Sequence, residues 1–434
     1  MRSIILICCS LFFYSVSDAQ SDSVYQSLIA KAGLFHLQKD YKSAISYYEK
    51  AFQIQQPDAL TAYKAASMYS LDSNHNEAFQ YLHLALSSGW TEADWQSFDP
   101  YFDYLRTSYA AKWRIIAEQA FMKESQYEST LELPALRKEI NSLTLDDQKL
   151  RYQKIQAKTD SARESINEQI MKSDIRNVNH AKKIIRQYGW PKISQIGKDG
   201  QNNFWLIVQH ADQDVRFQQV ALKAMEKLKG TNEINMENYA FLYDRVQCNL
   251  NYKQLYGTQV EWTNRGEASA FRPIFEEYKT DEIRKVIGLQ TLRIYALTYG
   301  FVYHKISPEQ SNKKDSEYKA QVQHLMDSAK VYYTKGQYQR TYDFYNAAST
   351  FLGGMSNADN FEAAIIFSKI ASVSNEDKYK SIALDFLNLL FLREDLSKAK
   401  LKKQPSFKIL FNEQRWIDID KGVRNKTTFD KSYK

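Results

Sequence analysis

The spacing of apolar residues predicts helices along most of the chain, and near its start that spacing repeats every 34 residues. Small and aromatic side chains recur in register at Ala32, Phe35, Ala44, Tyr48 and Ala51, and again at Ala66, Tyr69, Ala78, Leu82 and Ala85. Alanines let the two helices of a hairpin approach closely, while the larger side chains fill the seam between them. The pattern therefore predicts two successive helical hairpins.

The same spacing returns near the C-terminus. It occupies Ala329, Tyr332, Tyr338, Tyr345 and Ala348, with Thr341 in place of a small residue. A looser hairpin is predicted over residues 361–392, with its second helix displaced by an insertion around residues 374–378. Both regions resemble the tetratricopeptide repeat, whose paired helices stack. Because two hairpins bury little surface alone, we expect each stack to pack on the centre of the chain or on a partner.

Each repeat region ends in a similar segment. The first closes with Pro100-Tyr101-Phe102, Leu105 and Trp113, and the last with Pro405-Ser406-Phe407, Leu410 and Trp416. A stacked hairpin leaves one face without a neighbour, so we interpret both segments as caps over the exposed ends of the stacks.

The centre of the chain, residues 118–306, has a different pattern. Its expected helices cover residues 144–171, 177–188, 203–229, 235–250, 281–288 and 291–301. Gly189 and Trp190-Pro191 forbid continuation of the second helix, and a loop is expected from there to residue 203. A β-hairpin pairs residues 255–262 with 268–275. The predicted fold is mainly α, with tetratricopeptide-like hairpins at both ends around a central α-helical domain containing one small antiparallel β-hairpin.

The first residues are typical of a secretory signal. Arg2 precedes an uncharged apolar stretch, and Ser17-Asp18-Ala19 places small residues at both positions that determine cleavage. We expect residues 1–19 to be removed and the protein to be exported, to the periplasm or outside the cell; an uncleaved anchor helix is the alternative. The expected modules that follow are residues 20–117, 118–306 and 307–420, then a basic tail over 421–434.

Composition and charge narrow the classes of partner. The 434 residues include only 14 Gly and 7 Pro, which favours long helices and short turns. The formal net charge is +7, and basic clusters near the C-terminus suit peripheral contact with anionic envelope polymers or lipid headgroups. An exported protein does not normally meet nucleic acid, and no segment after residue 19 is apolar enough to span a membrane. We expect the repeat regions to bind a protein or peptide.

Several short motifs occur together in the central region. They are Asp147-Gln148 with Arg151, Gly189-Trp190-Pro191, residues 205–212, Phe217-Gln218, Asp244-Arg245, residues 256–259 and Gly288-Leu289. In this order they resemble the bacterial family catalogued as domain of unknown function 6624, over residues 136–297. The chain departs from that pattern in a long charged stretch between Arg151 and Asn177 and in Phe204, where Ala is more usual. The resemblance implies no activity, but it places these polar residues in one domain.

Polar residues of these motifs are the candidates for a functional site. His210 titrates near neutrality and follows an apolar helix, so its candidate role is acid–base catalysis, with Asp212 or Asp244 orienting the ring. The candidate ligand-binding residues are Trp190, Gln209, Arg245, Tyr256, Thr258 and Gln259. The alternative is a purely structural network, in which Asp212 caps the helix that begins near Asp214.

Neither a metal nor a cofactor is predicted. His210 and Asp212 lie two residues apart on a helix and point about 200° away from each other, so they cannot share an ion. A metal site would need His180 or distant acids. Three functions stay open: an exported protein-interaction or ligand-binding protein, a hydrolase-type enzyme with an acid–base site around His210 and Asp244, and a purely structural envelope protein.

Overall fold

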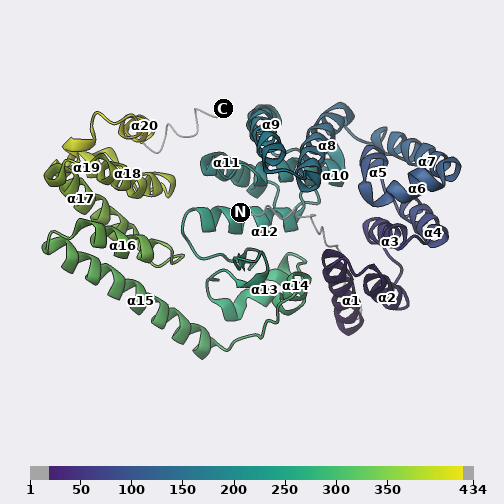
Figure 1. Cartoon of the computed structure of the whole chain (residues 1–434), viewed down its shortest axis with the longest axis horizontal. Helices are drawn as coiled ribbons and strands as arrows, with labels where there is room; N and C mark the ends of the chain where they lie inside the picture. Colours follow the sequence, from purple (N-terminus) through teal and green to yellow (C-terminus); the bar gives the residue numbers. More distant parts are fainter. Residues whose placement is uncertain (1–18, 424–434) are drawn as a thin grey trace.

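The computed structural model describes residues 19–423, and most of them are helical (Figure 1). Residues 1–18 of the predicted signal segment and the part of the basic tail after Val423 lie outside the described residues. The described chain forms an N-terminal group of hairpins, a central domain, and a C-terminal group of hairpins on the opposite side of the centre. The predicted mainly α fold is confirmed.

The N-terminal group contains the two predicted hairpins. Helix α1 (Ala19–Leu37) packs on α2 (Tyr41–Phe52), and α3 (Ala59–Leu71) packs on α4 (His75–Ser87). The alanines at the repeating positions are fully buried in the seams, namely Ala32, Ala44, Ala51, Ala66, Ala78 and Ala85. Asp58 starts α3 by accepting a hydrogen bond from the N–H of Thr61 at 2.8 Å.

The segments interpreted as caps lie where the hairpins end. In the first, α5 (Ala93–Phe98), the 3₁₀ turn η1 (Pro100–Phe102), α6 (Asp103–Ser108) and α7 (Ala110–Glu128) follow the hairpins. Phe102 is fully buried, and its ring centroid lies 5.7 Å from that of Trp113. At the other end of the molecule, Phe407 is equally buried, 5.8 Å from Trp416. Both caps belong to the core of their own stack.

The C-terminal group also consists of two hairpins and a cap. Helix α15 (Pro308–Thr334) packs on α16 (Tyr338–Ser349), and α17 (Asn357–Ser374) on α18 (Asp377–Leu392), followed by α19 (Lys398–Lys402), η3 (Pro405–Leu410) and α20 (Gln414–Gly422). The insertion expected around residues 374–378 coincides with the short connection between α17 and α18. Helix α17 runs on to Ser374, and Asn375 ends it in the left-handed conformation, with φ of 55°.

The central domain begins with long helices whose limits differ from those expected. They are α8 (Pro134–Gln156), α9 (Asp160–Tyr188), α10 (Ile193–Gln209), α11 (Val215–Glu226) and α12 (Met236–Asn249). The break falls at residues 157–159, because Thr159 caps a new helix by accepting a hydrogen bond from the N–H of Ala162. Gly189 ends α9 with φ of 71°, as predicted. The loop expected before residue 203 is helical, with a kink at Gly197.

A short antiparallel hairpin follows α12. Strand β1 (Val260–Trp262) pairs with β2 (Ala268–Phe271), with Val260 opposite Phe271. The strands are shorter than predicted because residues 254–259 fold around two buried side chains instead of extending the ladder. The 3₁₀ turn η2 (Glu277–Lys279), α13 (Thr280–Val286) and α14 (Leu292–Tyr299) complete the domain, and α14 packs on α1.

Both groups of hairpins are also fixed to the centre by arginines. Arg137 of α8 is completely buried and contacts Glu124 and Glu128 of α7 at 2.9 Å each. On the other side, Arg393 donates to the carbonyl oxygens of Leu250 and Asn251 at 2.8 and 3.1 Å.

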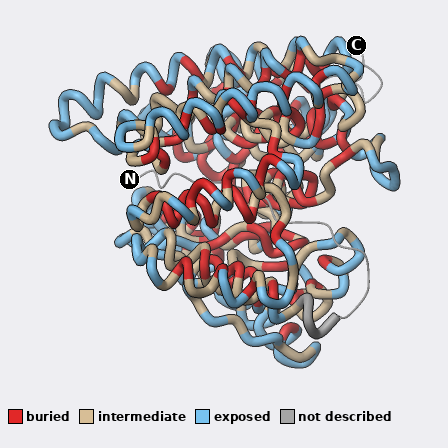
Figure 2. Tube along the Cα trace, turned by 90° about the vertical axis from the view of Figure 1, so that its right-hand side faces the viewer, coloured by how far each residue is buried: buried red, intermediate tan, exposed pale blue. Residues whose placement is uncertain are grey.

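Figure 2 shows buried stretches in the interior and exposed stretches along the outer turns. No helix in the described part of the chain is long and apolar enough to cross a membrane.

Candidate functional site

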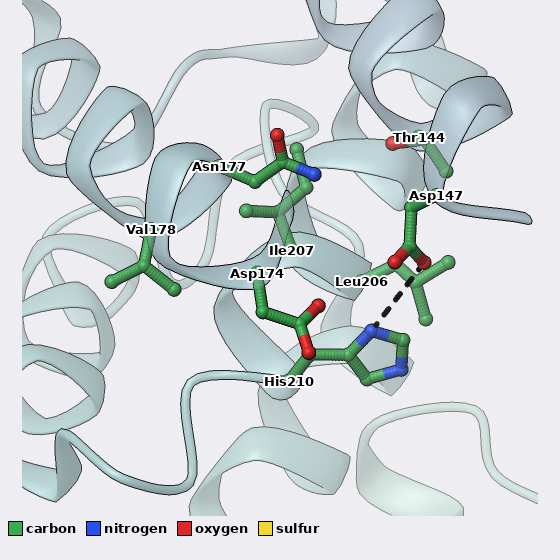
Figure 3. A pocket seen from close by; sticks show the side chains of 8 residues that line it. All are labelled: Thr144, Asp147, Asp174, Asn177, Val178, Leu206, Ile207 and His210. Atoms are coloured by element: carbon green, nitrogen blue, oxygen red, sulfur yellow. Dashed lines mark ion pairs between the residues drawn. The ribbon is translucent and has the colours of Figure 1, made fainter. Parts of the chain in front are cut away.

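A small pocket lies where α8, α9 and α10 meet in the central domain (Figure 3). Its lining residues are Thr144, Asp147, Asp174, Asn177, Val178, Leu206, Ile207 and His210. The helical period explains why polar side chains gather there. Asp147 and Arg151 are four residues apart on α8, and Asp174 and Asn177 are three apart on α9, so each pair occupies one face of its helix.

Asp147, Asp174 and His210 form the polar centre of this pocket. One nitrogen of His210 and one carboxylate oxygen from each aspartate all lie within 4.8 Å of one another. His210 Nδ1 is 3.9 Å from Asp147 Oδ2. Protein atoms enclose most of the His210 side chain, but 27% of its surface stays exposed. Solvent therefore reaches the mouth of the pocket.

Arg151 holds these three side chains together. Its Nε donates to Asp147 Oδ2 at 2.7 Å, and its Nη2 lies 2.9 Å from Asp174 Oδ1 and 3.3 Å from His210 Nδ1. A guanidinium has donors and no acceptor, so the contact with His210 requires a lone pair on Nδ1. The imidazole is therefore neutral in this arrangement, with its proton on Nε2.

Two polar oxygens of the pocket have no hydrogen-bond partner. Oδ1 of Asp147 is buried without one, and so is Oδ1 of Asn177. The two residues are only 4% and 3% exposed, and in Figure 3 one Asp147 oxygen turns toward the interior of the pocket. A buried acceptor without a donor is unfavourable by about 1–3 kcal/mol. The pocket therefore contains two oxygens that lack hydrogen-bond donors.

The electrostatics of the pocket favour uncharged imidazole. The near-neutral titration expected for His210 from the sequence is not what its surroundings produce. Burial lowers the pKa of His210 to about 4, and the nearby charge of Arg151 acts in the same direction. Burial raises the pKa of Asp174 to about 6, and the attraction of Arg151 offsets only part of this effect. Both shifts follow from enclosing titratable groups among apolar side chains with one guanidinium between them.

Asp212 does not share the pocket with His210. Because α10 ends at Gln209, both residues lie in the turn that follows, and the helical period does not set their directions. The guanidinium of Arg245 binds both oxygens of Asp212, with Nε at 2.7 Å from Oδ1. Burial raises the pKa of Asp212, but the hydrogen bond and charge of Arg245 outweigh it and lower the pKa overall. Asp214, rather than Asp212, caps α11.

Asp244 is engaged with the segment before β1. Its Oδ1 accepts hydrogen bonds from the N–H groups of Leu255 and Tyr256 at 2.8 and 3.0 Å. Its Oδ2 accepts from the N–H and the hydroxyl of Thr258 at 2.9 and 3.0 Å. Gln259 Nε2 donates to the same hydroxyl oxygen at 3.1 Å. The structure therefore brings Asp244, Tyr256, Thr258 and Gln259 together, but around a fully buried carboxylate rather than around His210.

The remaining candidates lie in the core. Trp190 is 2% exposed and packs edge-on against Phe204 at 5.0 Å. Gln209 is buried, and its Oε1 has no hydrogen-bond partner. His180 contacts Glu139 on the exposed side of the helices, away from the pocket lining.

The sequence reasoning missed Asp174 and gave Asp147 and Arg151 no chemical role. Asp174 falls in the long charged stretch between Arg151 and Asn177, where the chain departs from the family pattern. The signal that marks it is the helical period: Ile170, Asp174, Asn177 and Ala181 follow one face of α9, and all except Asp174 are buried. A charged residue on an otherwise buried stripe indicates a polar partner inside the fold.

Comparison with known proteins places this pocket within a recognisable region. Residues 134–304 match the model of a family of unknown function, DUF6624, which agrees with the resemblance seen in the motifs. Asp147, Asp174 and His210 all fall inside the match. No curated protein matches the chain, and no solved structure does.

Proposed function

We propose that the protein is a ligand-binding protein whose central domain holds a small ligand between α8, α9 and α10. One observation carries the proposal: two almost fully buried oxygens, on Asp147 and Asn177, line a solvent-reached pocket without a hydrogen-bond donor. Two carboxylates and one guanidinium meet there beside a neutral imidazole, so negative charge is in excess. A cationic ligand, or one rich in hydrogen-bond donors, complements this chemistry.

The test uses small cations of known charge on the intact protein. Methylguanidinium and 1,4-diaminobutane are the probes, and 1,4-butanediol is the uncharged match for the diamine. We expect the cations to raise the melting temperature of the wild type in a concentration-dependent way, because a ligand that binds only the folded state stabilises it. The diol should leave it unchanged.

Two neighbouring aspartates supply matched variants for this test. Asp147→Asn removes a pocket carboxylate and should abolish the response to the cations. Asp146→Asn alters an adjacent side chain that is 56% exposed and should keep the response. Equal shifts in both variants, or no response of the wild type to organic or metal cations, would remove the basis of the proposal and leave the polar cluster with a structural role.

A hydrolase is the second candidate, favoured by the meeting of a carboxylate, an imidazole and a guanidinium at one solvent-reached pocket. Such groups can position water and a polar substrate. The acid–base partners would be Asp147 and Asp174 rather than Asp244, whose oxygens are bound by residues 255–258. Turnover of a panel of chromogenic phosphate, ester and glycoside substrates, lost in Asp174→Asn and kept in Asp146→Asn, is the expected result; turnover independent of Asp174 contradicts it.

The location and a protein partner are part of the same proposal. We propose export because of the signal-like residues 1–19, and mass spectrometry of the secreted protein should find Gln20 at its N-terminus.

A protein partner is supported by the apolar side chains that α7 exposes, Ile115, Phe121 and Met122. Replacing Met122 by Lys should then abolish reproducible recovery of a partner from envelope extract, whereas unchanged recovery argues against this surface.

A further inference from the structure

We propose that the ligand of the α8–α9–α10 pocket is a divalent transition-metal cation, Zn²⁺ or Mn²⁺, bound by Asp147, Asp174 and His210. This inference rests on the proposed ligand-binding function and narrows it to one chemical class. It requires the guanidinium of Arg151 to move outward when the ion binds, because Arg151 contacts the same three side chains.

The separations of the three ligand atoms suit a single ion. Bonds from Zn²⁺ to nitrogen or carboxylate oxygen are about 2.0–2.2 Å long, so two ligands of one ion lie at most ~4.4 Å apart. His210 Nδ1 and Asp147 Oδ2 lie 3.9 Å apart, and no pair in the group exceeds 4.8 Å. The ligand atoms that are farthest apart therefore have to approach each other by at least ~0.4 Å when the ion binds.

The arrangement of Arg151 already shows how a cation is held there. Its guanidinium is a positive charge that contacts one carboxylate oxygen of Asp147, one of Asp174 and the Nδ1 lone pair of His210. A neutral imidazole that presents this lone pair is the form that coordinates metals. The Arg151 side chain is 22% exposed, so it has a route toward solvent when a stronger cation takes its contacts.

An independent observation points to a ligand beyond Arg151. Oδ1 of Asp147 has no hydrogen-bond partner although only 4% of the residue is exposed. Oδ1 of Asn177, which also has no hydrogen-bond partner, belongs to a residue that lines the same space. An ion accepting a second oxygen from Asp147, or a water bound to that ion, would satisfy these groups. Two carboxylates and one imidazole form a mixed oxygen and nitrogen set, which suits Mn²⁺ or Zn²⁺ better than Mg²⁺ or Ca²⁺.

The experiment measures metal binding to the tag-free, chelator-treated full chain. Titration calorimetry with ZnCl₂ and MnCl₂, followed by elemental analysis after dialysis, should show stoichiometric binding. Asp174→Asn should weaken the affinity at least tenfold, and Asp146→Asn should leave it unchanged. Binding that is equal in these two variants overturns the inference, because the ion then lies elsewhere on the chain.

Arg151→Gln gives the more specific test. It removes the competing positive charge, so it should tighten metal binding at least tenfold. The variant should also melt at a lower temperature than the wild type without metal and recover when metal is added. A purely structural ion pair predicts the same loss of stability but no recovery. If Arg151→Gln does not fold, the comparison of Asp174→Asn with Asp146→Asn decides.

The same samples separate this inference from the function on which it rests. Melting shifts with methylguanidinium, together with no calorimetric signal for either metal in the wild type, overturn the metal site and leave the ligand-binding proposal intact. No response to either kind of cation overturns both.

Discussion

Among single residues, Asp244 shows how a buried carboxylate is used to build a loop. It is fully buried, and burial raises its pKa, an effect opposed by the hydrogen bonds from Tyr256, Thr258 and Leu255. Four donors surround its two oxygens, so the residue organises the segment that leads into β1. A catalytic partner of His210 was the sequence-based hypothesis for Asp244, whereas its contacts are those of a structural anchor.

We predict that Asp244→Asn destabilises the protein strongly. The amide is almost the same shape, but its NH₂ group faces backbone donors where the carboxylate oxygen accepted two hydrogen bonds. The expected loss in unfolding free energy is about 2–4 kcal/mol, measured by urea denaturation. Asp212→Asn is the control, since its side chain is 41% exposed and should lose ~1 kcal/mol or less. Equal losses would contradict the role given to Asp244.

Side-chain identity alone could not separate these roles. His210 was singled out as a polar residue after an apolar helix, and it lines the pocket. Its neighbours Asp147 and Asp174 lie 63 and 36 residues earlier in the sequence. Their approach depends on the crossing of α8, α9 and α10, and no local spacing encodes that crossing.

At the scale of whole elements, the kink in α10 is the feature that the sequence pattern concealed. Gly197 has φ of 77°, a conformation that L residues other than glycine rarely adopt. A Cβ atom added there would lie 2.4 Å from the hydroxyl oxygen of Tyr127 on α7. The segment with Gly and Asn resembles a loop in composition, yet it forms helical turns on both sides of one glycine.

Gly197→Ala is therefore expected to destabilise the protein by about 2–3 kcal/mol, from backbone strain and the clash with Tyr127 together. The melting temperature measures the effect. Gly230→Ala provides the control because Gly230 also has positive φ, 81°, but has open space around its Cβ position; its loss should be ~1 kcal/mol. If the two variants melt alike, the contact between α7 and α10 contributes nothing.

The elements were predicted correctly where the spacing of apolar residues agreed with the positions of helix-ending residues. The buried alanines and the stop at Gly189 follow directly from residue type. The break between α8 and α9 was missed because charged residues continue on both sides of it, and only Thr159 marks the new start. The lengths of the two strands were overestimated. The side chains of Gln254 and Asp244 bind backbone groups that would otherwise have joined the ladder.

For the molecule as a whole, a buried charge cluster joins the N-terminal hairpins to the central domain. Arg137 is surrounded by Glu124, Glu128 and Asp199. Glu92, at the start of α5, lies close enough for these charges to shift the pKa of its carboxyl group. Burial raises its pKa to about 8, reinforced by the negative charge of Asp199. More acids than arginines meet in this cluster, and this excess of negative charge favours the protonated form of Glu92.

This cluster makes the stability of the protein depend on pH. A carboxyl with a raised pKa keeps its proton in the folded state after the unfolded chain has released it, so the unfolding free energy falls as pH rises from 4.5, the ordinary pKa of Glu92, to about 8. Glu92→Gln removes this loss. We expect the variant to gain melting temperature relative to the wild type at about pH 9 and not at about pH 4.

Glu118→Gln is the control for that pH comparison, because Glu118 is 69% exposed on α7. It should follow the wild type at every pH. A Glu92→Gln curve that also runs parallel to the wild type from acid to alkaline pH would show that Glu92 is ionised in the folded protein.

The burial of Arg137 has a consequence for how this region can be inherited. The family match begins at residue 134, whereas two of the acids that neutralise Arg137, and the carbonyl oxygen of Thr91 that it binds at 2.8 Å, come before that point. The matched stretch therefore relies on earlier parts of this chain for most of the acceptors that surround Arg137. Any protein that carries it behind a different N-terminal partner must supply other acceptors for that guanidinium, or place another residue there.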